Sequence, residues 1–106
     1  MFKIARKQTR PNSSVQFWQG QNSPTMTDDF RNYFYESYVL TGKFISASPV
    51  LSEDGLELTT TAIWNSESDF NESLNDPVCI EGMLNKSAEH KVATGIVTEE
   101  VLRETF

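Results

Sequence analysis

One tryptophan is the most distinctive chemistry-bearing residue of this 106-residue chain. Trp64 closes a run of β-prone residues, and an acidic segment, residues 65–78, follows at once. A tryptophan in this position either forms a wall of a ligand site or closes a hydrophobic core. Its indole N–H is a hydrogen-bond donor only, so in a ligand site it could polarise an oxygen atom of the bound molecule.

Other common catalytic and metal-binding arrangements lack the residues they need. One cysteine, Cys79, and one histidine, His90, are too few for a structural zinc site, so no metal is expected. The glycines are isolated, and no nucleophile-elbow sequence surrounds a serine. Adjacent acids such as Asp28 and Asp29 do not share a helix face and are expected to be solvated. We expect Cys79 to be buried as a small apolar residue rather than to react.

The charge distribution argues against nucleic-acid binding. The net charge is −6, and four of the nine basic residues fall within the first ten positions: Lys3, Arg6, Lys7 and Arg10. From position 11 onward fifteen acids face five bases, and this surface would repel a phosphate backbone. We expect the basic first segment to pair with an acidic strand near the other terminus, at Glu99, Glu100 and Glu104.

Length and composition predict a single globular domain over residues 1–106. Apolar residues make up 38% of the chain and include seven Phe and two Trp, which is enough for a small core. No apolar run is long enough to cross a bilayer, and no signal-peptide core follows the N-terminal basic residues. The single cysteine suits a reducing compartment, so we expect a cytoplasmic protein without membrane contact.

Hydrophobic spacing predicts a β region and then an aromatic helix. Residues 2–19 are β-prone with an interruption at Pro11, which predicts one broken strand, or a short arm before a main first strand at residues 14–19. The helix begins at Ser23–Pro24 or, alternatively, after Thr27, and it ends at Gly42. Its apolar stripe is expected to face a sheet rather than a ligand: Phe30, Tyr33, Phe34, Ser37, Tyr38 and Thr41.

The remaining segments predict a hairpin, a second helical region and a last strand. Residues 43–51 and 56–64 flank a turn-like SEDG and form the hairpin. Ser66 is a predicted N-cap, and Asp76 with Pro77 restarts the helix, which Gly95 closes. The tail, residues 96–106, is predicted to be a strand. On the second hairpin strand one face is shared by Leu56, Leu58, Thr60, Ala62 and Trp64.

This order of elements, β-α-β-β-α-β, predicts an α+β protein with the ferredoxin-like fold. Right-handed crossovers place both helices on one face of a four-stranded antiparallel sheet. The strands carry apolar residues on both sides, so the other face of the sheet also needs cover. We therefore expect a homodimer in which two sheets pack together.

Residues 59–81, TTTAIWNSESDFNESLNDPVCIE, resemble the third strand and second helix of antibiotic-biosynthesis-type monooxygenases. The shared pattern is a strand that ends in Trp, a Ser-capped acidic turn, a Phe, and an Asp/Asn-rich break before more helix. The first helix and the hairpin fit the same plan, so the resemblance covers nearly the whole chain. It implies a dimeric α/β barrel, a fold that hosts many functions.

The heme-degrading branch of this superfamily uses a first-strand Asn, this Trp and a His on the second helix. The Trp position matches Trp64, but the His position falls on Met83, and the first strand offers only Gln16. A thioether is an uncommon sole axial ligand, so the comparison implies neither heme degradation nor a cofactor. We expect His90, two helical turns after Met83, at the surface or the helix end rather than on iron.

Cofactor-free, quinone-forming members of the superfamily oxidise polycyclic aromatic substrates. By this resemblance, the substrate supplies the electrons, and the protein positions it and polarises an oxygen. No catalytic residue is assigned, and two functions stay open: an oxidative enzyme acting on a small hydrophobic aromatic molecule, and a non-catalytic ligand-binding or assembly module. The ligand-binding candidates are Trp64, Asn65, Tyr33, Tyr38 and Met83.

Overall fold

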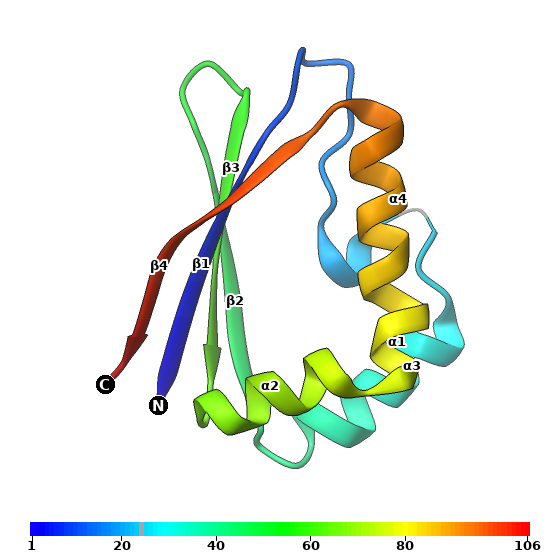
Figure 1. Ribbon diagram of the computed structural model, residues 1–106, viewed down its shortest axis with the longest axis vertical. Helices are drawn as coiled ribbons and strands as arrows, with labels where there is room; N and C mark the ends of the chain where they lie inside the picture. The colour runs from blue at the N-terminus through cyan, green and yellow to red at the C-terminus, as the bar shows by residue number, and fades with distance from the viewer. Residues whose placement is uncertain (24) are drawn as a thin grey trace.

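The computed structural model describes residues 1–23 and 25–106, which form one sheet with helices on one side (Figure 1). The strands are Phe2–Thr9 (β1), Phe44–Leu51 (β2), Glu57–Trp64 (β3) and Val97–Thr105 (β4). The helices are Asp28–Phe34 (α1), Glu67–Asn75 (α2), Pro77–Cys79 (α3) and Asn85–Thr94 (α4). The strands pair antiparallel in the order β2-β3-β1-β4.

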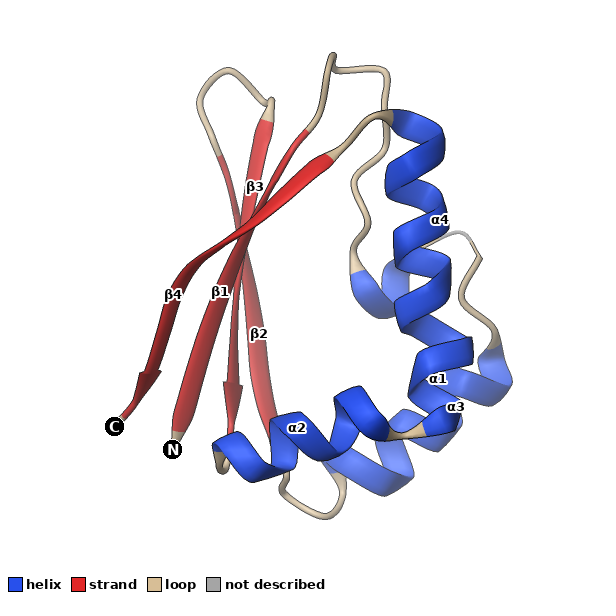
Figure 2. Ribbon diagram, in the orientation of Figure 1, coloured by secondary structure: helices blue, strands red, loops and turns tan. Residues whose placement is uncertain are grey.

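This arrangement is the β-α-β-β-α-β order of the ferredoxin-like fold, and the predicted fold class is confirmed. Figure 2 shows the labelled helices on the same side of the sheet, with α1 and α2 at one end and α4 at the other. The hairpin of β2 and β3 and the strand at the C-terminus are also confirmed. No helix in the described part of the chain combines the length and apolar character that a membrane span requires.

Side-chain caps begin the helices where the sequence indicates. The Ser66 hydroxyl accepts a hydrogen bond from the Asp69 N–H at 3.1 Å, and Asp76 accepts one from the Val78 N–H at 2.9 Å. Of the two predicted starts for the first helix, the one after Thr27 is confirmed: its hydroxyl accepts from the Phe30 N–H. Pro24, the alternative start, lies outside the described residues.

Two π-helical turns interrupt the described helices, and the helical spacing of the sequence does not reveal them. Tyr35–Val39 follows α1, and Ile80–Leu84 joins α3 to α4. Such wide turns are rare and often occur at functional sites. They carry Tyr38 and Met83, two of the predicted ligand-binding residues.

The prediction of a strand at residues 14–19 is wrong, because the first strand is β1 and it ends at Thr9. Side chains at the end of β1, and not backbone hydrogen bonds of a β-ladder, hold residues 14–19 in place. The Gln8 amide donates to the Trp18 carbonyl at 2.7 Å and accepts from the Trp18 N–H at 3.0 Å. Arg10 donates to the carbonyl of Val15 at 2.8 Å. Phe17 and Trp18 are buried, so their β-like pattern reflects packing of a loop rather than a strand.

The buried residues form two clusters at opposite ends of the helix-facing side of the sheet. The larger one, the aromatic core, lies under α1 and α2 and consists of Phe2, Ile4, Trp18, Met26, Phe30, Phe34, Tyr38, Trp64, Phe70 and Cys79. The smaller one consists of Phe17, Leu58 and Ile96. Between the clusters, the same side of the sheet is incompletely covered: Arg6 is exposed, and Thr60 and Ala62 are half-buried.

The opposite side of the sheet carries the predicted pairing of the basic first strand with the acidic last strand. Lys3 lies 3.7 Å from Glu104, and Lys7 lies 2.9 Å from Glu99. Glu100, which was expected to take part, instead forms an ion pair with Arg103 at 2.9 Å. The same side of the sheet exposes apolar residues in register with Thr59, Thr9 and Ala5, namely Val50, Val97 and Leu102.

Candidate functional site

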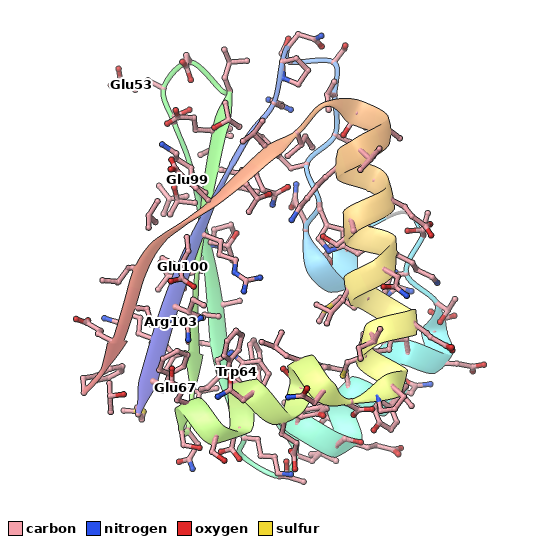
Figure 3. The ribbon with its side chains drawn as sticks, viewed as in Figure 1. Glu53, Trp64, Glu67, Glu99, Glu100 and Arg103 are labelled. Atoms are coloured by element: carbon pink, nitrogen blue, oxygen red, sulfur yellow. The ribbon has the colours of Figure 1, made fainter. Side chains whose placement is uncertain are left out.

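Trp64 lies at the end of β3 and faces the helices (Figure 3). Only 5% of its surface is exposed. Its ring meets four other aromatic rings nearly edge-on, at centroid distances between 5.1 and 6.3 Å, and these belong to Phe34, Tyr38, Phe44 and Phe70. Edge-to-face contacts of this kind fix the plane of the indole. Trp64 therefore closes the aromatic core, as one of its two predicted roles requires.

The indole N–H of Trp64 nevertheless stays available. No described residue accepts a hydrogen bond from it, although a buried indole N–H usually finds a partner. Among the described residues, only the Thr98 hydroxyl is both fully enclosed and unpaired. The Trp64 nitrogen is therefore not sealed in, and it can donate to a molecule that lies against the core.

Asn65 follows Trp64 in the chain but lies outside the core. It is exposed, and its side-chain amide donates to Asp69 at 3.3 Å. Its backbone N–H donates to the Lys43 carbonyl at 2.8 Å. Successive strand residues point to opposite faces, so the amide and the indole do not converge on one point.

Tyr33 and Tyr38 meet on a carboxylate that the sequence analysis had identified only as a helix cap. Their hydroxyls donate to the same oxygen of Asp76, at 2.6 and 2.7 Å. Burial opposes ionisation of Asp76, but these two bonds and the Val78 N–H outweigh it and hold the pKa of the carboxyl below its usual range. Burial, and then the bond to Asp76, raise the pKa of Tyr38. Both hydroxyls thus bind the cap of α3 and join it to α1 and to the π-helical turn that follows α1.

A surface hollow of about 390 Å³ lies beside this junction. Across it, the Lys43 ammonium forms an ion pair with Glu72 at 2.6 Å and lies 5.8 Å from the centre of the Tyr38 ring. The hollow is lined by Tyr33, Ser37, Tyr38, Lys43, Glu72, Asn75, Asp76 and Pro77. Because its charged and phenolic groups are already paired with one another, the hollow offers few free polar groups to a ligand.

Cys79 lies beneath the same junction and is fully buried. Its sulfur lies 3.7 Å from Asp76. Burial, and then the negative charge of Asp76, raise the pKa of the thiol to about 11. The prediction that Cys79 is buried as a small residue is confirmed.

Met83 and His90 contact different parts of the protein. Met83 is half-buried and packs against the aromatic core. The His90 ring nitrogen Nε2 lies 2.6 Å from the carbonyl of Gln16, and its ring lies 5.9 Å from Trp18. His90 therefore holds residues 14–19 against α4. In the described part of the chain, no three His, Cys, Asp or Glu side chains group closely enough to hold a metal ion.

Two cations lie at the incompletely covered part of the sheet: Arg6, which was expected to pair with the acidic last strand, and Lys91, which was given no role from the sequence. Arg6 lies on the helix-facing side of β1, between the buried residues Ile4 and Gln8. Lys91 lies on α4, and its pKa is lowered, first by burial and then by the charge of Arg6. We use the name sheet–α4 site for Arg6, Thr60 and Ala62 of the sheet together with Met83, Ser87 and Lys91 of the second helical region. Alternation along β1 predicts which side of the sheet Arg6 faces, whereas the effect of the Arg6 charge on Lys91 depends on the tertiary structure.

An ion-pair network borders this site on the β4 edge. Figure 3 shows Arg103 between Glu100 and Glu67. The guanidinium lies 2.9 Å from each carboxylate and 5.7 Å from the ring centre of Phe70. Both carboxylates are therefore already engaged by Arg103.

Comparisons with known proteins show which fold this chain shares. No protein-family model matches the sequence, and no curated protein matches it. A single-residue variant of SnoaB, described as a cofactor-independent oxygenase from Streptomyces nogalater, superposes with a TM-score of 0.55. The match covers 99% of this chain and 91% of that one, at 13% identity. The chain shares the fold of this oxygenase.

Two further structures superpose less closely. SnoaB itself gives a TM-score of 0.49 at 13% identity, over 99% of this chain and 95% of that one. Rv0793 from Mycobacterium tuberculosis gives 0.44 at 9% identity, over 100% and 98%. The resemblance to antibiotic-biosynthesis-type monooxygenases that residues 59–81 carry is confirmed at the level of the fold.

Proposed function

We propose that this protein binds a small aromatic molecule at the sheet–α4 site and oxidises it with dioxygen, without a resident cofactor. The observation that carries this proposal is the Trp64 indole. Four rings hold it in place, and its N–H has no partner among the described residues. The likeness to SnoaB, described as a cofactor-independent oxygenase, supports the type of reaction.

The packing around the site supports a ligand at this place. Helix α4 buries none of its residues, whereas α1 buries Phe30 and Phe34. On the sheet opposite, Thr60 and Ala62 are small and half-buried. A flat hydrophobic molecule placed there would contact Met83 and the edge of the aromatic core, and would cover surface that the chain leaves open.

The proposed chemistry needs no reductant. A CH₂ group between two aromatic rings reacts with O₂ to give a ketone and one water, so the substrate loses four electrons and O₂ gains four. In a molecule such as anthrone, a ketone conjugated with the CH₂ group allows this group to lose a proton to water or buffer and become an enolate. The enolate donates electrons to O₂ and forms the new C–O bond as a peroxide, which then loses water to leave the second ketone. Trp64 N–H would hydrogen-bond to the enolate oxygen and stabilise its negative charge.

Anthrone, which carries such a CH₂ group, tests this function. We expect the protein to accelerate oxygen uptake and anthraquinone formation, measured with an oxygen electrode and by absorbance. Trp64→Phe keeps an aromatic ring but removes the N–H, and should slow the reaction by about tenfold or more. Tyr33→Phe is the control and should leave the rate unchanged, because its hydroxyl is bound to Asp76. Rates equal to those with serum albumin would refute the proposal.

A non-catalytic ligand-binding role is the second candidate, and one observation favours it. Of the polar groups proposed from the sequence, the Tyr33 and Tyr38 hydroxyls are bound to Asp76, and Asn65 faces outward. Only the Trp64 N–H is left to act on a substrate. Binding of anthrone without oxygen uptake would favour this second role.

We also expect the protein in the cytoplasm, because its one cysteine is free and buried.

We infer that the protein acts as a homodimer. The exposed apolar residues Val50, Val97 and Leu102 on the outer side of the sheet support sheet-to-sheet packing. Light scattering after size exclusion should give twice the mass of the chain. Leu102→Asp should shift it towards monomer, whereas Val92→Asp, on the exposed face of α4, should not. A stable wild-type monomer at micromolar concentration would refute the dimer.

A further inference from the structure

We propose that α4 is a lid that opens by local unfolding and admits a ligand to the sheet–α4 site. The helix detaches from the β1–α1 loop, residues 10–23 and 25–27 of the described chain, while the sheet and the aromatic core stay folded. The admission of a ligand rests on the proposed function, whereas the opening of α4 is a property of the fold alone.

The face that α4 turns towards the rest of the protein is polar. Its half-buried residues fall at helical spacing and are Lys86, Ser87, His90, Lys91 and Thr94. Its apolar side chains lie on the outer face, where Val92 is 86% exposed. An amphipathic helix is normally held in place by burial of an apolar stripe, and α4 buries none. The helix α1 differs, because it buries the rings of Phe30 and Phe34.

The tertiary hydrogen bonds of α4 reach the β1–α1 loop and not the sheet. The Nε2 atom of His90 lies 2.6 Å from the Gln16 carbonyl, and because a carbonyl only accepts, Nε2 carries the proton. The His90 ring also lies 5.9 Å from the Trp18 ring. The Lys86 ammonium donates to the Thr25 carbonyl at 2.9 Å. Both bonds are exposed, so water competes for the same groups. In the described chain, no side chain of α4 bonds or ion-pairs with a strand.

The β1–α1 loop is bound more firmly on its other side. Figure 2 shows the loop passing between α4 and the sheet. Gln8 of β1 forms two buried hydrogen bonds with the backbone of Trp18. Phe17 is buried with Leu58 and Ile96, and Trp18 belongs to the aromatic core. Because the contacts of the loop with the sheet are buried and those with α4 are exposed, the boundary between α4 and the loop is the weaker one.

The chain on either side of α4 limits how far the opening extends. Before α4, the turn Ile80–Leu84 is π-helical, and Met83 packs against the aromatic core. After α4, Gly95 has a φ of +75°, and Ile96 is buried. Hinges lie at the ends of elements, where a few residues absorb the rotation of the backbone. A helix of ten residues is marginal in water without tertiary contacts, so α4 unfolds as it detaches.

Opening of α4 changes the access to the sheet–α4 site. Ser87 and Lys91 belong to α4 and leave the site with the helix, whereas Arg6, Thr60 and Ala62 stay on the sheet. A hydrophobic molecule can then enter from the side of α4 while the aromatic core stays closed. Return of the helix would exclude water from the bound molecule.

Hydrogen exchange, measured by NMR at pH 7.0, tests the opening without any ligand. After correction for intrinsic rates, the amides of residues 89–94 should exchange at least about a hundredfold faster than the slowest amides of β1 and β3. Their rates should change little in low urea, because a local opening exposes little surface. The Trp18 N–H should exchange as slowly as the amides of β1, because the Gln8 side chain holds it to the sheet.

A matched pair of variants tests which contact keeps the helix closed. His90→Phe keeps a ring beside Trp18 and a similar helix propensity, but it loses the bond to the Gln16 carbonyl. It should speed exchange in α4 about fivefold, which is the effect of one hydrogen bond. Glu89→Gln, on the exposed face of the same helix, should leave the rate unchanged. In anaerobic stopped-flow fluorescence, His90→Phe should also raise the rate constant for anthrone binding, by about the same factor.

The outcomes separate the lid from the proposed function. Exchange of α4 only together with β1 and β3, with the same urea dependence, would overturn the lid. Loss of Trp18 N–H protection together with that of α4 would also overturn it, because the loop would then open with the helix. An unchanged rate of exchange in His90→Phe would overturn the role of His90, and an unchanged rate of anthrone binding would overturn α4 as the entrance. Opening of α4 without any binding of anthrone would overturn the proposed site and leave the opening in place. Circular dichroism checks that both variants are folded.

Discussion

The two ends of the helical layer meet the same sheet in different ways. At one end, α1 and α2 bury Phe30, Phe34 and Phe70 against the sheet, and the rings of Phe34 and Phe70 contact Trp64. Beside α4, which buries none of its residues, Arg6 on β1 is exposed, and Thr60 and Ala62 on β3 are half-buried. This stretch of the sheet lies between the aromatic core and the small buried cluster of Phe17, Leu58 and Ile96. The first region is a closed core, and the second is a stretch of the sheet that the helices cover less completely. Rings fix the side chains of the first region, whereas the second carries small and charged side chains.

Truncating the centre of the closed end should have the largest effect. The Phe34 ring contacts the rings of Phe30, Tyr38, Phe44 and Trp64. Phe34→Ala should lower the free energy of unfolding by about 3–5 kcal/mol, measured by urea denaturation. Lys91→Ala, at the open end, should change it by less than about 0.5 kcal/mol. Similar losses for both variants would abolish the contrast between the ends.

Gly82 tests how closely the second helical region approaches the first. A β-carbon at this position would lie 2.3 Å from a ring atom of Phe30, which is too close for any side chain. Gly82→Ala should therefore destabilise the protein by about 1–3 kcal/mol through overpacking. Ser87→Ala, on the half-buried face of α4, is the control and should be close to neutral. A neutral Gly82→Ala would show that the closed end is looser than its ring contacts indicate.

Asp76 gives the closed end a dependence on acid. Its pKa is lower in the folded protein than in the unfolded chain, so the unfolded state binds more protons as the pH falls. The stabilisation is fully present above about pH 4, the usual pKa of Asp, and is lost as the pH falls through the folded pKa. Asp76→Asn cannot titrate and should flatten this loss in urea denaturation between pH 2 and 6. An unchanged acid dependence in the variant would assign the effect to other carboxylates.

The smallest effect is expected from added hemin, which should not bind at Met83. Met83 stands where the heme-degrading enzymes are expected to have histidine, and it packs against the aromatic core. Hemin added to the purified protein should therefore give no sharp, stoichiometric Soret shift. If a clear shift appears and Met83→Ala removes it, then Met83 binds heme iron through its thioether.

Much of the fold follows from local patterns. Ser66 and Asp76 cap helices because their side chains reach N–H groups two or three residues ahead, which is a short-range effect. The aromatic stripe of the first helix and the alternation in β3 fix which side chains face inward, because each depends only on the period of its element. Residues 14–19 are where such patterns fail. There the apolar side chains of Phe17 and Trp18 pack a loop into the core. The side-chain amide of Gln8 bonds the Trp18 backbone where a neighbouring strand would have done so.

The candidate site shows the same division. The sequence by itself determined that Trp64 lies at the end of a strand, on the face that turns towards the helices. It also determined that the residue nineteen positions later is Met83 and not a histidine. Only the tertiary structure decided that Tyr33 and Tyr38 share Asp76, and that the charge of Arg6 acts on Lys91. These pairs are separated by 43, 38 and 85 positions, and no local period relates residues so far apart. Their meeting depends on how β1, α1 and α4 pack, which is a property of the whole chain.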